Sequence, residues 1–243
     1  MPAVPPKREN LFLNLLCNIA VPTIVLMKFS SDKWLGPQWG MLVALAFPLG
    51  YLVYDLIKRR KTNVFSVVGI ASVLLTGTLN QLKADGFWFA VKEGAVPLVF
   101  GAAVLISMRT KQPLVHEMLW NDQVIDTAKV NAALAERGNQ SAFARLLDRA
   151  SYGMALSFLL SSVLNFGLAR YLLRSPPGTE AFNAELGKMQ MLSWPVIVLP
   201  TMAVTIVVFY RLITGMTQLT GLDFEAIIHG GKPKPDPAAG AGR

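Results

Sequence analysis

The sequence predicts an all-α integral membrane protein with six transmembrane helices, and two observations support this fold class. Of the 243 residues, 53% are apolar and only 16% are charged, whereas an average soluble domain has roughly 45–50% apolar and about 25% charged residues. The apolar residues are also grouped into blocks of about 20, the length of a helix that crosses the hydrocarbon core of a bilayer.

Six blocks meet this description. We expect each to be a helix, because an open strand cannot satisfy its backbone hydrogen bonds in lipid. The first block follows Lys7 and Arg8 but is not followed by a small-residue cleavage site, so we expect a retained span rather than a signal peptide. The predicted spans are residues 11–29, 37–57, 64–82, 88–108, 150–172 and 191–213.

The distribution of lysine and arginine predicts the orientation. With both ends in the cytoplasm, 16 of the 23 basic residues lie inside and seven lie outside, as the positive-inside rule requires. The strongest single signal is a basic run directly after the second span, which we expect to bind the anionic inner leaflet of the bilayer. The run consists of Lys58, Arg59, Arg60 and Lys61. This membrane explanation accounts for the net charge of +8 without nucleic acid as a partner.

The spans divide the chain into five parts. A cytoplasmic N-terminal segment (1–10) precedes the first membrane part (11–108, four spans). A cytoplasmic amphipathic connection (109–149) leads to the second membrane part (150–213, two spans). The C-terminal segment (214–243) is cytoplasmic and ends in a Gly, Pro and Ala-rich tail that predicts disorder.

The cytoplasmic connection is the one sizeable segment outside the membrane. Val124, Ile125, Ala128 and Ala132 fall on one side of a predicted helix, which Gly138 and Asn139 interrupt. Two interpretations remain open. The segment either lies on the inner leaflet as an amphipathic helix or forms a docking surface for a partner protein.

Several spans carry small or polar residues four apart, on one helix face. The sets include Ser72, Thr76 and Asn80 in the third span, and Ser157, Ser161 and Asn165 in the fifth; Asn18 lies on a similar stripe in the first. Such stripes face protein or water rather than lipid. They indicate either helix–helix packing or the lining of a polar cavity.

Ionisable residues inside the spans supply the remaining site candidates. Asp55 is placed to form an interfacial ion pair with Arg59, or alternatively to couple a proton. Lys92 and Glu93 lie about one turn into the fourth span. Because adjacent residues point about 100° apart on a helix, we expect them to need different partners, with Lys92 extending to the outer interface. A cavity or relay role for this pair is the alternative to a structural one.

Prolines interrupt four spans, and two of them share a context. Pro22 lies in IAVPTIVL and Pro97 in GAVPLVFG, which raises the hypothesis of two inverted three-helix halves, as in many secondary transporters.

The sequence predicts no enzyme and no cofactor. A single cysteine, Cys17, and two histidines argue against a metal site. Phosphate-cradling and nucleophile motifs are absent from the sequence, so no catalytic residue is assigned.

The stretch LISMRTKQPLVHEML (105–119) resembles the end of a span in the bacterial intracellular septation protein A family (IspZ, also called YciB). Phe87, Trp88 and Lys92 are similar to that family's entry to the same span, and residues 156–167, including Asn165, resemble its next span. The segment at about 121–145 and the C-terminal tail depart from the family.

This resemblance implies a small polytopic protein of the bacterial inner membrane that acts in envelope maintenance and division and assembles with other envelope proteins. It carries no catalytic residue over to this chain. The alternative is a small secondary transporter with a polar site formed by Lys92, Glu93, Asn18 and Asn165. The oligomeric state is left open.

Overall fold

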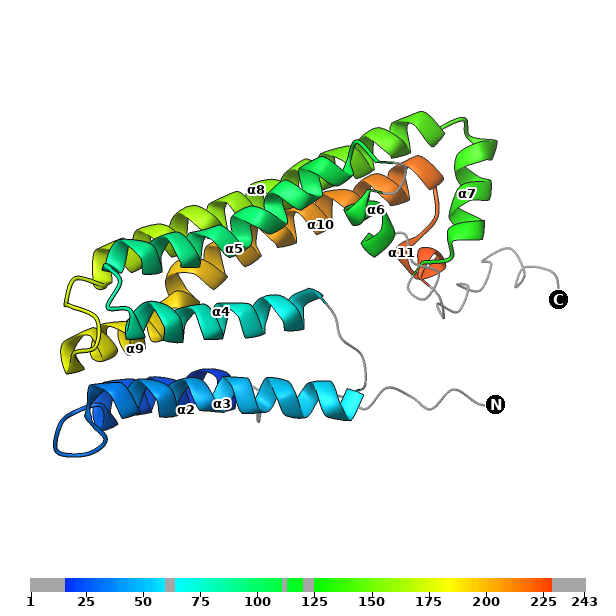
Figure 1. The fold of residues 1–243 in the computed structure, drawn as a ribbon. Coiled ribbons are helices and arrows are strands. Elements are labelled where there is room, and N and C mark those ends of the chain that lie inside the picture. Colours follow the sequence, from blue (N-terminus) through cyan, green and yellow to red (C-terminus); the bar gives the residue numbers. More distant parts are fainter. Residues whose placement is uncertain (1–15, 60–63, 111–112, 120–124, 229–243) are drawn as a thin grey trace. The chain divides into compact units, whose positions relative to one another are not determined.

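The computed structural model describes residues 16–59, 64–110, 113–119 and 125–228 (Figure 1). Their regular structure is helical, with one isolated antiparallel bridge between Ile125 and Ile228. The helical elements in chain order are η1 (Leu16–Ala20), α2 (Val21–Ile24), η2 (Val25–Phe29), α3 (Gly36–Arg59), α4 (Val64–Gln81), α5 (Gly86–Ser107), α6 (Leu114–Leu119), α7 (Thr127–Glu136), α8 (Gln140–Leu172), α9 (Glu180–Ser193), η3 (Trp194–Val198), α10 (Leu199–Thr220) and α11 (Phe224–Ile227).

Four helical stretches in this part of the chain are long and apolar enough to cross a membrane. They are Gly36–Tyr54, Gly86–Ser107, Gln140–Leu172 and Glu180–Thr220. The first predicted span is represented by a shorter apolar helix, Leu16–Phe29, and α4 is helical over the third without being one of the four. The all-helical, multi-pass prediction is therefore supported, whereas the count of six spans stays a prediction.

Two helices extend well beyond the predicted spans. The fifth span was expected to begin at residue 150, but α8 begins at Gln140 and continues without a break into the apolar stretch. The sixth was expected to begin at residue 191, but α9 begins at Glu180, where the Thr179 side chain accepts a hydrogen bond from the Phe182 amide at 3.2 Å. Hydropathy marks only the apolar part of such helices, whereas the cap marks where the helix begins.

Two of the span prolines lie in or beside π-helical turns. Pro22 is the second residue of α2, between the π segments η1 and η2, and Pro195 lies in η3. At the end of η3 the Leu199 amide donates to the Trp194 carbonyl, a bond one residue longer than in an α-helix. The freed backbone groups beside a proline are commonly satisfied in this way. Pro48 and Pro97 lie inside α3 and α5.

The chain forms two compact units, each made of two separate stretches. Unit 1 comprises Met1–Pro97 and Ser161–Pro200, and unit 2 comprises Leu98–Leu160 and Thr201–Arg243. Unit 1 combines the first predicted three-helix half with parts of the second, and unit 2 contains only parts of the second, so the units do not coincide with those halves and the halves stay a hypothesis.

The core of unit 1 forms where α3, α5, α8 and α9 meet the N-terminal apolar helix. Phe89 and Phe182, with at most 1% of their surface exposed, pack edge to face with ring centroids 4.9 Å apart. Met41 and Ala44 of α3 complete this contact region. Aromatic pairs of this geometry contribute about 0.5–1.5 kcal/mol beyond the area that they bury.

The larger core of unit 2 joins α7 to α8 and α10. Val130 and Leu134 of α7 are fully buried against Leu147 of α8 and Met216 of α10. The predicted interruption at residues 138–139 is confirmed: Gly138 adopts φ 65°, and the Asn139 side chain donates to the Leu219 carbonyl at 2.8 Å. That bond satisfies a carbonyl in the last turn of α10. It also attaches the turn between α7 and α8 to the end of α10.

Candidate functional site

A buried ammonium group is the centre of the candidate site in unit 1. Lys92 of α5 is 7% exposed. Its Nζ donates to Thr76 Oγ1 at 2.8 Å and to Ser72 Oγ at 3.3 Å, both on α4. The Thr76 hydroxyl in turn donates to the Ser72 carbonyl at 3.0 Å, so its oxygen is free to accept from the lysine.

The third partner of this ammonium is the neighbouring carboxylate. Lys92 Nζ lies 2.7 Å from Glu93 Oε1, and the two side chains are 5% and 25% exposed. This contact corrects the expectation that adjacent residues need different partners and that Lys92 extends to the outer interface. The lysine side chain is long and flexible, so its ammonium can reach the side chain of the next residue. The angle between the Cα–Cβ bonds of adjacent residues does not exclude such a contact.

The cluster of Lys92, Glu93, Ser72 and Thr76 is electrically neutral and saturates the donors of the ammonium. Lys92 has three N–H groups, and the three contacts use all of them. An ion pair taken out of water is tolerated only when such additional hydrogen bonds are present. The cluster therefore joins α4 to α5 as a polar contact within the apolar helices.

The hairpin of α4 and α5 explains why these residues meet. The connection between the helices is short, from Leu82 to Asp85, and includes Lys83 at φ 49°. Thr76 and Lys92 lie at nearly equal distances along the chain from this turn, so an antiparallel pair of helices brings them to about the same level. The predicted stripe on the third span thus packs against α5. Its third member, Asn80, is 4% exposed and accepts a hydrogen bond from the Gly178 amide at 3.1 Å.

The two predicted asparagines have other surroundings. The Asn165 amide donates to the Ser161 carbonyl of its own helix at 2.7 Å. The Asn18 backbone carbonyl accepts from Gln190 Nε2 at 3.2 Å, which links η1 to α9. These contacts lie within α8 and between η1 and α9, and they are consistent with the packing interpretation of the polar stripes.

The other predicted site residues lie at the edge of what the structure describes. The backbone of Asp55, Lys58 and Arg59 belongs to α3, but their side chains lie outside the described set, and Arg60 and Lys61 lie outside the described residues altogether. The lipid-anchoring basic run and the proposed pair of Asp55 with Arg59 stay predictions.

The side of the helix predicted to be apolar in the cytoplasmic connection is not the side that is buried in α7. Val130 and Leu134 of α7 are buried, whereas Ala128 and Ala132 are exposed. Ile125 packs at the margin of the core, and Val124 lies outside the described residues. The choice of face failed because alanine occurs on both buried and exposed helix faces, so only the branched residues carried the signal.

One polar contact was missed by the sequence reasoning. Glu185 of α9 accepts from the amides of Arg174 and Ser175 at 3.0 Å each and from the Ser175 hydroxyl at 2.7 Å. This carboxylate organises the turn between α8 and α9. A carboxylate that accepts hydrogen bonds from two successive backbone amides produces no periodic pattern in the sequence, so this contact could not be predicted.

Within the described residues, no three His, Cys, Asp or Glu side chains gather as a metal site would require. No family model, curated protein or solved structure matches the chain.

Proposed function

We propose that this protein is a non-enzymatic, polytopic membrane protein of the bacterial envelope, with six spans and both termini in the cytoplasm. Its role is to assemble with other membrane proteins in envelope maintenance and division, through a docking surface on the α7 segment. The resemblance to septation protein A suggests the process, and the exposed face of α7 suggests the means.

The observation that carries this proposal is the composition of the α7 surface. This helix, described over its whole length, exposes no large apolar side chain, because Val130 and Leu134 point into the core. A helix that lies on a leaflet must present large apolar residues to lipid. The exposed residues are instead small or polar, among them Ala128, Ala132 and Ala135 at helical spacing. Such a face permits close approach of another helix and favours docking over lipid contact.

A single bulky substitution on that face tests the proposal. Ala132→Arg, at native expression in the source cell, is expected to remove proteins that co-purify in mild detergent and to produce elongated or detergent-sensitive cells. Ala181→Arg is the matched control, because Ala181 is also an exposed helical alanine, on α9. Exposed alanine-to-arginine changes alter stability by less than about 0.5 kcal/mol, so both variants should fold. Normal assembly and normal cells with Ala132→Arg would contradict docking at α7.

A secondary transporter is the second candidate, and the buried pair of Lys92 and Glu93 favours it. Ionisable groups within spans often serve substrate or proton pathways. In that case the neutral double variant Lys92→Met/Glu93→Gln would abolish the cellular function even when the protein folds. The assembly proposal expects that variant to retain function, because the cluster is saturated by hydrogen bonds and would act only in packing.

A further inference from the structure

Unit 2 contains a groove between α8 and α10 that the preceding functions do not use. It has a volume of about 730 Å³. The two helices approach closely at two glycines: a Cβ at Gly153 would lie 2.5 Å from Val208, and one at Gly215 would lie 2.6 Å from Leu146. Because small residues such as Ala150 and Ala203 also line it, the surface is hollowed where larger side chains would fill it.

The wall of the groove is apolar along most of its length. Leu156 of α8 and Val207 of α10 line it and are 58% and 50% exposed. Both helices belong to stretches apolar enough to cross a membrane, so this wall faces lipid if they do. From Ala203 to Arg211 the groove follows α10 for about 12 Å at 1.5 Å per residue, a length that accommodates the first half of an acyl chain.

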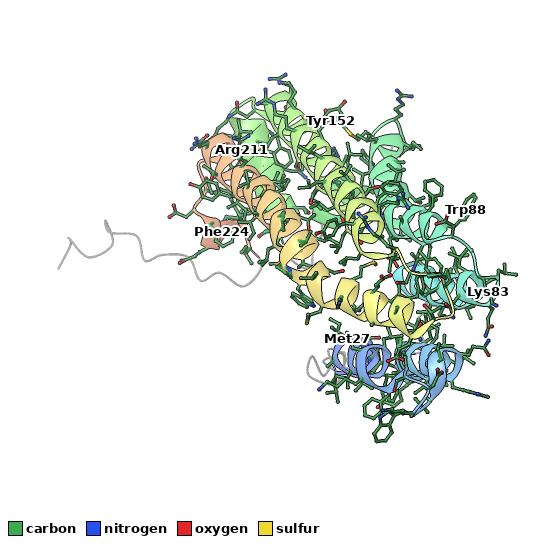
Figure 2. All side chains as sticks on the ribbon, turned by 90° about the vertical axis from the view of Figure 1, so that its left-hand side faces the viewer. Met27, Lys83, Trp88, Tyr152, Arg211 and Phe224 are labelled. Atoms are coloured by element: carbon green, nitrogen blue, oxygen red, sulfur yellow. The ribbon has the colours of Figure 1, made fainter. Side chains whose placement is uncertain are left out.

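The polar part of the lining carries two arginines, one from each helix. Arg149 of α8 and Arg211 of α10 both line the groove and are exposed; Arg211 is labelled in Figure 2. Among the residues that the structure describes, no carboxylate forms an ion pair with either guanidinium. Thr214 and Gln218 lie in the same lining and add hydrogen-bonding groups.

This combination of groups matches the chemistry of one class of ligand. A guanidinium binds phosphate through parallel, charge-assisted hydrogen bonds. Both arginines lie at the cytoplasmic ends of their predicted spans, the level of lipid phosphates. A free phosphate ion would use the arginines but leave the apolar wall in contact with solvent or bulk lipid. A zwitterionic lipid would add a positive group next to two arginines.

We propose that the groove binds one anionic phospholipid, whose phosphate contacts Arg149 and Arg211 and whose acyl chain lies along Leu156, Ala203 and Val207. This binding is independent of the docking surface on α7 and would hold whether or not that surface has a partner.

Native mass spectrometry of the full chain, released from detergent with added lipid, tests the charged end. Wild-type protein should retain one phosphatidylglycerol in preference to phosphatidylcholine. Arg149→Gln/Arg211→Gln should weaken the apparent affinity for this lipid about a hundredfold, because each guanidinium contributes at least one charge-assisted hydrogen bond worth about tenfold. The matched control is Arg109→Gln/Arg145→Gln, which removes two exposed arginines of the same unit that do not line the groove and should leave retention unchanged.

Filling the groove tests the apolar wall and separates a lipid from a free anion. Ala203 is exposed, so Ala203→Leu should fold normally yet lose phosphatidylglycerol while keeping both arginines. Equal retention of the two lipids, equal loss in the control double variant, full retention in Ala203→Leu, or displacement of the lipid by millimolar inorganic phosphate would each overturn the proposal. Unchanged thermal unfolding of the variants establishes that any loss of lipid is local.

Discussion

At the scale of single residues, Lys92 shows that a charge inside an apolar helix can be a structural contact. Its ammonium is bonded to Ser72, Thr76 and Glu93 at 2.7–3.3 Å, so the charge is compensated within the protein. The pair is stable only while both of its charges are present. A buried ion pair contributes little relative to apolar residues of the same shape, whereas one partner left alone is strongly unfavourable.

We therefore expect the single variant Glu93→Gln to be worse than the double variant Lys92→Met/Glu93→Gln. Glu93→Gln leaves the buried ammonium without its counter-charge and should lower the free energy of unfolding by about 2–3 kcal/mol, discounted for the partial exposure of Glu93. The double variant should recover most of this loss, because methionine fills the volume of Lys92. The measurement is unfolding by dodecyl sulfate in mixed micelles.

An exposed lysine supplies the reference for that series. Lys188 on α9 is exposed, so Lys188→Met removes a charge that is in contact with solvent. This variant should shift the free energy of unfolding by less than about 0.5 kcal/mol. If the double variant were as unstable as Glu93→Gln, the cluster would contribute net favourable energy, and the argument from desolvation would be wrong.

The sequence identified the members of the Lys92 cluster but not their association. Helical periodicity placed Ser72 and Thr76 on one face, and hydropathy marked Lys92 and Glu93 as unusual. Joining them required the register of the α4 and α5 hairpin, which depends on the turn at residues 82–85. The groove was not foreseen, because it depends on which faces of α8 and α10 approach each other.

At the scale of elements, helix positions were predictable where composition alone decides them. The spans expected at 37–57, 64–82 and 88–108 agree closely with α3, α4 and α5. Prediction failed where helices continue into polar sequence, as in α9, whose buried Phe182, Leu186 and Met189 alternate with polar residues. Tertiary packing stabilises such a helix, and the hydropathy of a window does not report it.

Two helical glycines provide a test of element packing in unit 1. A Cβ at Gly187 of α9 would lie 2.5 Å from Met27, 3.3 Å from the Thr23 carbonyl and 3.4 Å from Leu26, whereas one at Gly167 of α8 would meet nothing within 4 Å. Gly187→Leu should therefore separate α9 from the N-terminal helix and cost about 1–3 kcal/mol. Gly167→Leu should gain up to about 1 kcal/mol from helix propensity.

Thermal unfolding in a mild detergent compares these two variants directly. Figure 2 labels Met27, the residue in the tightest of these contacts. If Gly187→Leu were as stable as the wild type, close packing of α9 on residues 16–29 would not hold in solution.

At the scale of the whole molecule, the number of membrane crossings determines which loops face the cytoplasm. Four apolar stretches satisfy the requirements of length and composition, and the basic residues favour both termini on one side. Both termini lie on the same side if the number of crossings is even, and this condition is met by four spans as well as by six. The two differ in whether the N-terminal helix Leu16–Phe29 and α4 cross as well. Those crossings decide the side on which the loop before α3 and the connection between α3 and α4 lie.

Single-cysteine labelling determines these sides. In a Cys17→Ser background, six spans place Asp32→Cys, Leu82→Cys and Pro176→Cys outside and Asn131→Cys inside; all four positions are exposed in the structure. A membrane-impermeant maleimide should therefore label the first three in intact spheroplasts and Asn131→Cys only after permeabilisation. Four spans without the N-terminal helix and α4 would leave Asp32→Cys unlabelled until permeabilisation, with Leu82→Cys and Pro176→Cys still labelled. Residue 32 thus separates the two topologies, because only a crossing by the N-terminal helix brings it to the outer side, whereas residue 82 lies outside in both.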